Sequence, residues 1–203
     1  MVCQDDICIK PSDRQDEKTK ASAVLVTGDM NEIKSDEYFF VPGAMFDVQA
    51  KASPIKITNL YYQGIQGDVW VDIYSKQWTH FNWAGKQGKW DLIGSAYLKV
   101  APNDTPTLLP FNTFRPILLP KWHRRGFYIQ TRDCGTDCNK LRVWLGENYA
   151  VNAKPFIENE DIRMLEGCAL KGKFDNSGQR CKQERGGESF TFWGGVQYVV
   201  RPE

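Results

Sequence analysis

The chain has 203 residues, enough for one domain to bury a large core without help from a metal or cofactor. Its 26 Lys and Arg residues nearly balance its 25 Asp and Glu residues. The net charge of +1 argues against a dedicated nucleic-acid binder and against a polybasic membrane anchor. The longest segment without a charged residue, Ser189 to Val200, is too short to span a bilayer.

The first twenty residues are predicted to form a charged arm. Residues 11–20 contain no aliphatic side chain, so this segment has nothing to bury. The chain begins without the basic and apolar regions of a secretory signal peptide. Residues 21–203 show neither a linker nor an internal repeat, and they are predicted to form a single domain.

From residue 21 onward the pattern is that of β-strands. Apolar and polar residues alternate with a period of two, as in Val69–Tyr74, and no 12-residue window has a helical period. The predicted strands are 23–26, 38–41, 46–51, 55–58, 69–74, 90–100, 114–119, 127–130, 141–145, 162–167 and 190–200. About ten short strands without helices between them predict an all-β, antiparallel two-sheet sandwich of jelly-roll type.

Two glycines, Gly194 and Gly195, interrupt the last predicted strand. A glycine inside a strand weakens it unless a bulge or a close approach of another backbone requires the missing side chain. We therefore expect the chain to bend, or to contact another segment closely, at this point.

The chain contains six cysteines: Cys3, Cys8, Cys134, Cys138, Cys168 and Cys181. An even number fits three disulfides in an oxidising compartment. Free thiols and a zinc site are the alternatives, although the spacings differ from those of zinc knuckles. The predicted pairs are the local ones, Cys3 with Cys8, Cys134 with Cys138 and Cys168 with Cys181, because turn-forming residues let the ends of such segments approach.

No catalytic motif is visible in the sequence. The only histidines, His80 and His123, lie away from any nucleophile motif and are expected on the surface. Asp47 and Asp72 are expected on solvated outward faces of their strands. Two convergent carboxylates would instead make the chain a carbohydrate-active enzyme on a jelly-roll scaffold. The sequence predicts no catalytic residue, no metal site and no cofactor.

Aromatic residues concentrate between positions 70 and 90, where four of the seven tryptophans lie. Trp70 and Tyr74 fall on the opposite strand face from the apolar residues Val69, Val71 and Ile73. Outward rings stack on sugars or anchor a protein partner, unless loops or the second sheet cover this face. The candidate binding residues are Trp70, Tyr74, Trp78, His80, Asn82 and Trp83.

A small basic group, Lys121, Arg124 and Arg125, follows a predicted edge strand. Such a group is either a solvated loop or a docking point for an acidic glycan or an acidic partner.

Eight short blocks follow one another between residues 38 and 200. They are Gly43–Lys51, Ile55–Leu60, Val69–Lys76, Trp90–Ile93, Thr105–Pro110, Phe127–Ile129, Asn159–Gly167 and Trp193–Tyr198. Together they resemble a β-sandwich domain common in predicted secreted and cell-surface proteins of diatoms and related stramenopile algae. The resemblance implies a binding or assembly module and no catalytic residues. The charged arm and the cysteine-bearing segments 133–139 and 168–181 depart from the family pattern.

The main hypothesis is a non-enzymatic extracellular or cell-surface module. It would act as a structural protein whose partner is a glycan, a matrix protein or further copies of itself, without inserting into a membrane. One alternative is a self-assembling shell, tube or filament subunit, similar to those around algal pyrenoids and located in the chloroplast stroma. The other is a jelly-roll carbohydrate-active enzyme. Disulfides favour secretion, and reduced thiols favour an intracellular shell.

Overall fold

The structure is a computed structural model that describes residues 22–26, 38–102, 105–132, 140–145, 155–174 and 189–201. It also describes the backbone of two short N-terminal strands, β1 (Val2–Gln4) and β2 (Ile7–Ile9). The rest of the predicted arm lies outside the described residues, as do Cys134, Cys138 and Cys181.

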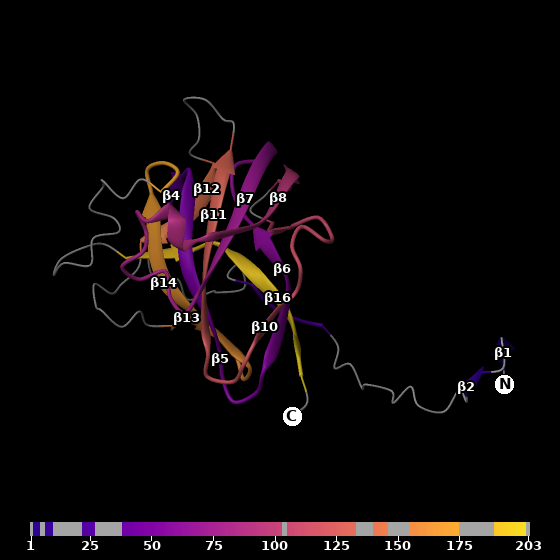
Figure 1. Ribbon diagram of the computed structural model, residues 1–203. Helices are drawn as coiled ribbons and strands as arrows, with labels where there is room; N and C mark the ends of the chain where they lie inside the picture. Colours follow the sequence, from indigo (N-terminus) through magenta and orange to yellow (C-terminus); the bar gives the residue numbers. More distant parts are fainter. Residues whose placement is uncertain are drawn as a thin grey trace.

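Two antiparallel sheets make up the domain. The larger sheet contains, in spatial order, β4 (Tyr38–Val41), β12 (Leu141–Leu145), β15 (Phe190–Phe192), β14 (Ile162–Leu170), β5 (Gly43–Ala50), β11 (Arg124–Arg132), β7 (Gly67–Gln77) and β8 (Asp91–Val100), with β13 (Pro155–Glu158) paired to β14. The smaller sheet contains β10 (Ile117–Leu119), β6 (Ile55–Tyr62), β16 (Gly194–Val200) and β3 (Ala23–Val26), with β9 (Thr107–Leu108) paired to β6. Figure 1 shows β6, β10 and β16 on one side of the larger sheet.

This arrangement confirms the predicted all-β sandwich; its two sheets have fourteen strands among the described residues, in place of about ten. The additional strands include β9 and β13, which are short and lack a clear alternating pattern. The described residues form no α-helix, only the single 3-10 turn η2 (Gln87–Lys89). Within the described residues, no helix is long and apolar enough to span a membrane.

The main core lies between the two sheets. On β5, the alternate residues Phe46, Val48 and Ala50 are completely buried, as the period of two predicts. The Phe46 ring stacks on those of Phe127 and Phe192, with centroids 5.7 Å and 4.3 Å away. Burying one such side chain stabilises the fold by roughly 1.5–3 kcal/mol. This core joins the inner face of the larger sheet to the smaller sheet.

The predicted last strand is divided in two at Trp193. The segment before it, β15, belongs to the larger sheet, and β16 after it belongs to the smaller one. A Cβ atom on Gly194 would overlap the Phe192 ring and the carbonyl oxygen of Tyr61. The predicted close approach is thus confirmed, and it is the point at which the chain crosses between sheets.

A second apolar cluster covers the outer face of the larger sheet. It consists of Met45, Tyr74, Ala84, Trp90, Tyr128, Cys168, Leu170 and Phe174. The connection between β7 and β8 supplies Trp90, and the segment after β14 supplies Phe174, whose ring lies 4.9 Å from that of Tyr128. The outer face of this sheet is therefore largely a second core and not a solvated surface.

The cysteines within the described strands lie where a disulfide is feasible. Cys3 on β1 is directly opposite Cys8 on β2. Residues paired in this way have Cα atoms roughly 4.5–5.5 Å apart, within the range that a disulfide spans. Cys168 on β14 is buried and disulfide-bonded. The three predicted pairings themselves stay predictions.

Candidate functional site

A buried carboxylate organises the connection that follows β7. Asp47 on β5 is completely buried, and three donors from this connection converge on it. The Thr79 hydroxyl donates to Oδ2 at 2.5 Å, and the backbone N–H of His80 donates to Oδ1 at 2.9 Å. The His80 ring nitrogen Nδ1 lies 2.8 Å from Oδ1. Asp47 therefore anchors the connection to the sheet through two consecutive residues.

The approach of this connection depends on a glycine in the neighbouring strand. Gly126 on β11 is paired with Asp47 on one side and with Lys76 on the other. A Cβ atom at position 126 would lie 2.9 Å from the backbone nitrogen of His80 and 3.2 Å from the carbonyl carbon of Thr79. Only a residue without a side chain lets the backbone of the connection lie this close to the sheet.

The environment of Asp47 keeps it ionised. Burial by itself raises the pKa of a carboxyl group, because it penalises the charged form. The charge of His80 and the hydrogen bonds from His80 and Thr79 outweigh this effect, so the pKa of Asp47 falls below its ordinary value of 3.8. Arg124 lies 3.7 Å from Oδ2 and adds a further positive charge.

Two tryptophans are exposed at this end of the domain. Trp78 is 61% exposed and Trp122 is 57% exposed. The ring of Trp78 lies 5.3 Å from the ring of His123. The backbone of Trp122 is held in place, because its N–H donates to the carbonyl oxygen of Lys51 and its own carbonyl oxygen accepts a hydrogen bond from Gln49. We call Trp78, Trp122 and His123 the tryptophan surface.

Both exposed tryptophans have an unfavourable backbone conformation. Their φ angles are +72° for Trp78 and +62° for Trp122, in the left-handed region that bulky side chains seldom adopt. Such a conformation costs of order 1–3 kcal/mol per residue, and it persists where the surrounding structure holds it. Here the hydrogen bonds around Asp47 and Lys51 supply that support.

A group of lysines surrounds Trp83, the half-buried ring of the same connection. The Nζ atoms of Lys76, Lys86 and Lys89 lie 4.5, 4.9 and 5.8 Å from its ring centroid. The indole N–H of Trp90 donates to the carbonyl oxygen of Trp83 at 3.0 Å and fixes this part of the backbone. We call Lys76, Lys86 and Lys89 the lysine cluster.

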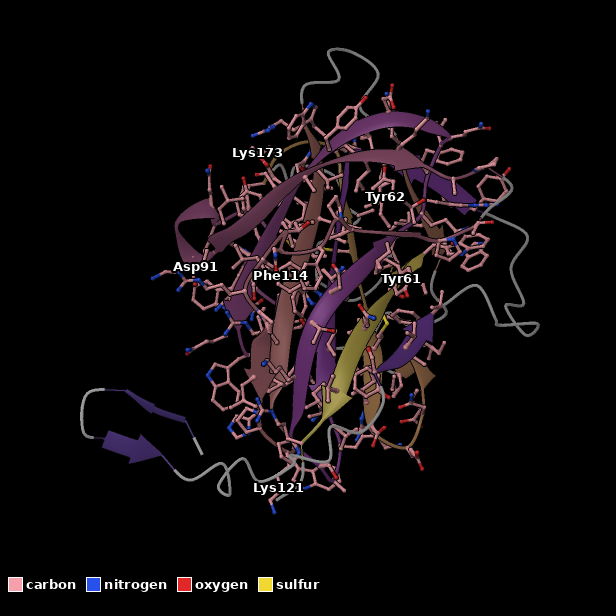
Figure 2. The ribbon with its side chains drawn as sticks, turned by 90° about the vertical axis from the view of Figure 1, so that its right-hand side faces the viewer. Tyr61, Tyr62, Asp91, Phe114, Lys121 and Lys173 are labelled. Atoms are coloured by element: carbon pink, nitrogen blue, oxygen red, sulfur yellow. The ribbon has the colours of Figure 1, made fainter. Side chains whose placement is uncertain are left out.

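The predicted basic group divides between the two faces of β11. Arg124 points to the outer face, where it meets Asp47. The Nε of Arg125 donates to the Ser75 hydroxyl at 2.6 Å. Partial burial lowers the pKa of Arg125, and the negative charge of Asp91 opposes that shift. Lys121 is exposed at the end of the domain opposite Lys173 (Figure 2).

A second exposed aromatic pair lies at the other end of β7. Trp70 is 43% exposed and Tyr97 on β8 is 49% exposed, with ring centroids 5.5 Å apart. The guanidinium of Arg132 lies over Trp70 at 5.2 Å and also 3.4 Å from Asp72. This placement fits the prediction that Trp70 faces outward.

Four residues that the sequence analysis expected to be exposed are buried in the structure. Tyr74 and His80, both candidate binding residues, are only 4% and 6% exposed. Asp47 and Asp72 are buried as well, although they were expected on solvated strand faces. The alternation itself is right, since these strand residues point away from the main core. The β7–β8 connection and the segment that ends at Phe174 cover that face, which the period of two does not reveal.

The structure retains Trp78, Asn82 and Trp83 as accessible candidates and adds residues that the sequence reasoning missed. Asn82 is exposed on the connection and has a φ of +64°. Trp122 is absent from the predicted site, although an aromatic residue between Lys121 and His123 is a signal that could have identified it. The lysine cluster was also missed, although Lys86 and Lys89 follow Trp83 at three-residue intervals.

The buried carboxylates are too far apart to act as a catalytic pair. Asp47 is in register with Lys76 across β11, so Asp47 and Asp72 are separated by two strand spacings across the sheet and by four residues along β7. Strand spacing and rise place them about 16 Å apart, whereas glycosidases need roughly 5–9.5 Å. Among the described residues, no hydroxyl or thiol hydrogen bonds to the His80 ring, and no three ligating side chains group around a metal position. The geometry presents rings and cations for binding.

Comparison with protein-family models finds no match to this chain, and no curated protein matches it in sequence.

Proposed function

We propose that the protein is a non-enzymatic binding module of a cell surface or extracellular matrix, and that the tryptophan surface binds a polysaccharide. The observation that carries this proposal is the exposure of Trp78 and Trp122 on a backbone that is strained and held in place. Exposed rings of this kind stack on sugar rings. Asparagine or glycine would relieve the strain at both positions, so stability alone gives no reason for tryptophan there.

The anchoring around Asp47 supports the same proposal. A binding surface on a loop loses affinity if the loop must become ordered when the ligand arrives. Three hydrogen-bond contacts to Asp47 hold Thr79 and His80, the two residues after Trp78. The ring of Trp78 is therefore positioned before a ligand binds.

Two further observations agree with an extracellular module. The disulfide at Cys168 is the kind of bond that persists in an oxidising compartment. The two-sheet sandwich is the architecture implied by the resemblance to secreted and cell-surface proteins of stramenopile algae. Membership of that family is part of the proposal.

Affinity electrophoresis tests the proposal with hydroxyethyl cellulose, carboxymethyl cellulose, dextran and dextran sulfate in the gel. We expect at least one of these polymers to retard the native protein. The double variant Trp78→Asn/Trp122→Asn should migrate as it does without polymer. Phe111→Asn is the matched control, because Phe111 is 89% exposed but lies in the β9–β10 connection.

Two results contradict the proposal. One is that no polymer retards the native protein. The other is that the Trp78→Asn/Trp122→Asn variant keeps its retardation. Circular dichroism of the variants, with unchanged strand signal, separates a lost surface from a lost fold.

Self-assembly is the second candidate function, and one observation favours it. β8 is a ten-residue strand at the edge of the larger sheet, paired on one side with β7. A long edge strand is a template for pairing with another chain. Light scattering over a range of protein concentrations tests this candidate, since a growing mass that Ala96→Pro abolishes would support assembly through β8. A constant monomer mass would exclude it.

A further inference from the structure

The lysine cluster brings three like charges to one side chain. Lys76 comes from the end of β7, and Lys86 and Lys89 come from the connection to β8. Their Nζ atoms all lie within 5.8 Å of the centroid of the Trp83 ring. The negative face of an indole ring attracts each ammonium group, but it leaves their mutual repulsion uncompensated.

No carboxylate neutralises this cluster within the described residues. None of the ion pairs there involves Lys76, Lys86 or Lys89. Asp47 shares a row of the sheet with Lys76 through Gly126, but it is enclosed by Thr79 and His80. The cluster is therefore a concentrated positive charge that is open to an external anion.

The surroundings extend the positive charge. Residues 76–91 and 121–125 together carry six Lys and Arg residues and one acidic residue, Asp91, although the whole chain has a net charge of only +1. Asp91 lies near Arg125, on the other face of β11 from Arg124. A local field of this kind attracts and orients anionic ligands.

We infer that the lysine cluster binds the carboxylate or sulfate groups of an acidic polysaccharide whose sugar ring stacks on Trp78. The inference rests on the proposed function and adds the chemical class of the glycan. The cluster and Trp78 belong to the same end of β7 and its connection. A polymer with both a planar sugar face and regularly placed negative groups matches the two features together, and a neutral glycan matches only one.

The test compares polymers that share a backbone and differ in charge. Carboxymethyl cellulose is paired with hydroxyethyl cellulose, and dextran sulfate is paired with dextran. The native protein should bind at least one anionic member at least tenfold more tightly than its neutral counterpart. Comparing the affinity for carboxymethyl cellulose with the affinity for dextran sulfate shows whether the cluster recognises carboxylate or sulfate groups.

The variant Lys76→Gln/Lys86→Gln/Lys89→Gln should lower the affinity for the anionic polymer at least tenfold. The control variant changes net charge equally at other places in the fold, with Lys56→Gln on β6, Lys99→Gln on β8 and Lys140→Gln before β12. It should alter the affinity less than threefold. Thermal unfolding of both variants confirms that each is folded.

Three results would overturn these ideas, and they can be told apart. Equal binding of charged and neutral polymers, with dependence on Trp78, refutes the inference and leaves the proposed function standing. Retention of all glycan binding by the Trp78→Asn/Trp122→Asn variant refutes the proposed function. Equally tight binding of polyglutamate refutes the acidic glycan as the specific ligand and indicates an acidic protein instead.

Discussion

Replacing Asp47 by asparagine removes a negative charge from the anchor of the tryptophan surface and keeps the size of the side chain. One oxygen remains to accept the hydrogen bond of the His80 N–H. The new amide group takes the place of Oδ2, so this donor faces the Thr79 hydroxyl, which donated to the carboxylate, and the positive charge of Arg124. Two contacts to a charged group are thus lost.

The size of the effect follows from the burial of Asp47. Hydrogen bonds to a charged group contribute about 1.5–3 kcal/mol each, and removing one member of a buried ion pair costs about 3–5 kcal/mol. We expect Asp47→Asn to lower the free energy of unfolding by about 3–5 kcal/mol. At a typical denaturant dependence for a domain of this size, the urea midpoint falls by about 1–2 M.

Urea unfolding followed by tryptophan fluorescence measures this difference, with Asp68→Asn as control because Asp68 is exposed on the same sheet. The control should change the stability by less than about 0.5 kcal/mol. The folded protein lowers the pKa of Asp47, so its contribution is present above the ordinary value of 3.8 and is lost as the pH falls through the lowered value. The difference between the native protein and Asp47→Asn should therefore disappear in strong acid.

The reasoning about Asp47 fails if Asp47→Asn lowers the free energy of unfolding by less than about 1 kcal/mol at neutral pH. That loss is smaller than the contribution of one hydrogen bond to a charged group. It also fails if the difference from the native protein persists unchanged well below pH 3.8, because the carboxyl group is then protonated.

Three other predictions concern the same connection and the cysteines. Gly126→Ala should destabilise the fold by about 1–3 kcal/mol in thermal unfolding, because its Cβ would press on the His80 backbone. The control Gly88→Ala, which has open space around it, should be neutral or slightly stabilising. Trp78→Asn should match or exceed the native stability by up to about 1 kcal/mol while losing glycan binding, since asparagine tolerates the left-handed conformation; a clear loss of stability would show that the ring is structural. Thiol labelling of the denatured, unreduced protein should find no free cysteine, and six labelled thiols would refute the disulfides and the oxidising compartment.

Most of the fold could be predicted from the sequence because strands leave a local signal. Successive residues of a strand point to opposite faces of the sheet, so the period of two in β5 and β7 can be seen in the local sequence alone. Many short strands with no helical period between them were enough to predict a sandwich. Gly194 marked the crossing between the sheets, since a glycine within a strand has few other physical reasons.

The candidate site was predicted only in part, because its exposure depends on residues far apart in the chain. Trp78 was among the predicted binding residues because of the concentration of aromatic residues around it, and it is exposed. Trp122 was missed, because it joins Trp78 only through the pairing of β11 with β7, across more than forty residues. His80 was expected at the surface, and nothing local to it indicates that Asp47 lies beneath.

The sequence by itself determined which residues share a face of each strand, because alternation follows from the geometry of an extended chain. It did not determine what covers the face. The side chains of Asp47, Asp72 and Tyr74 point away from the main core as predicted, yet they are buried. The segment that ends at Phe174 and the β7–β8 connection, which folds back over the sheet, cover this face. Only the tertiary structure decides that path, since it depends on the space at Gly126 and on the charge of a carboxylate from another strand.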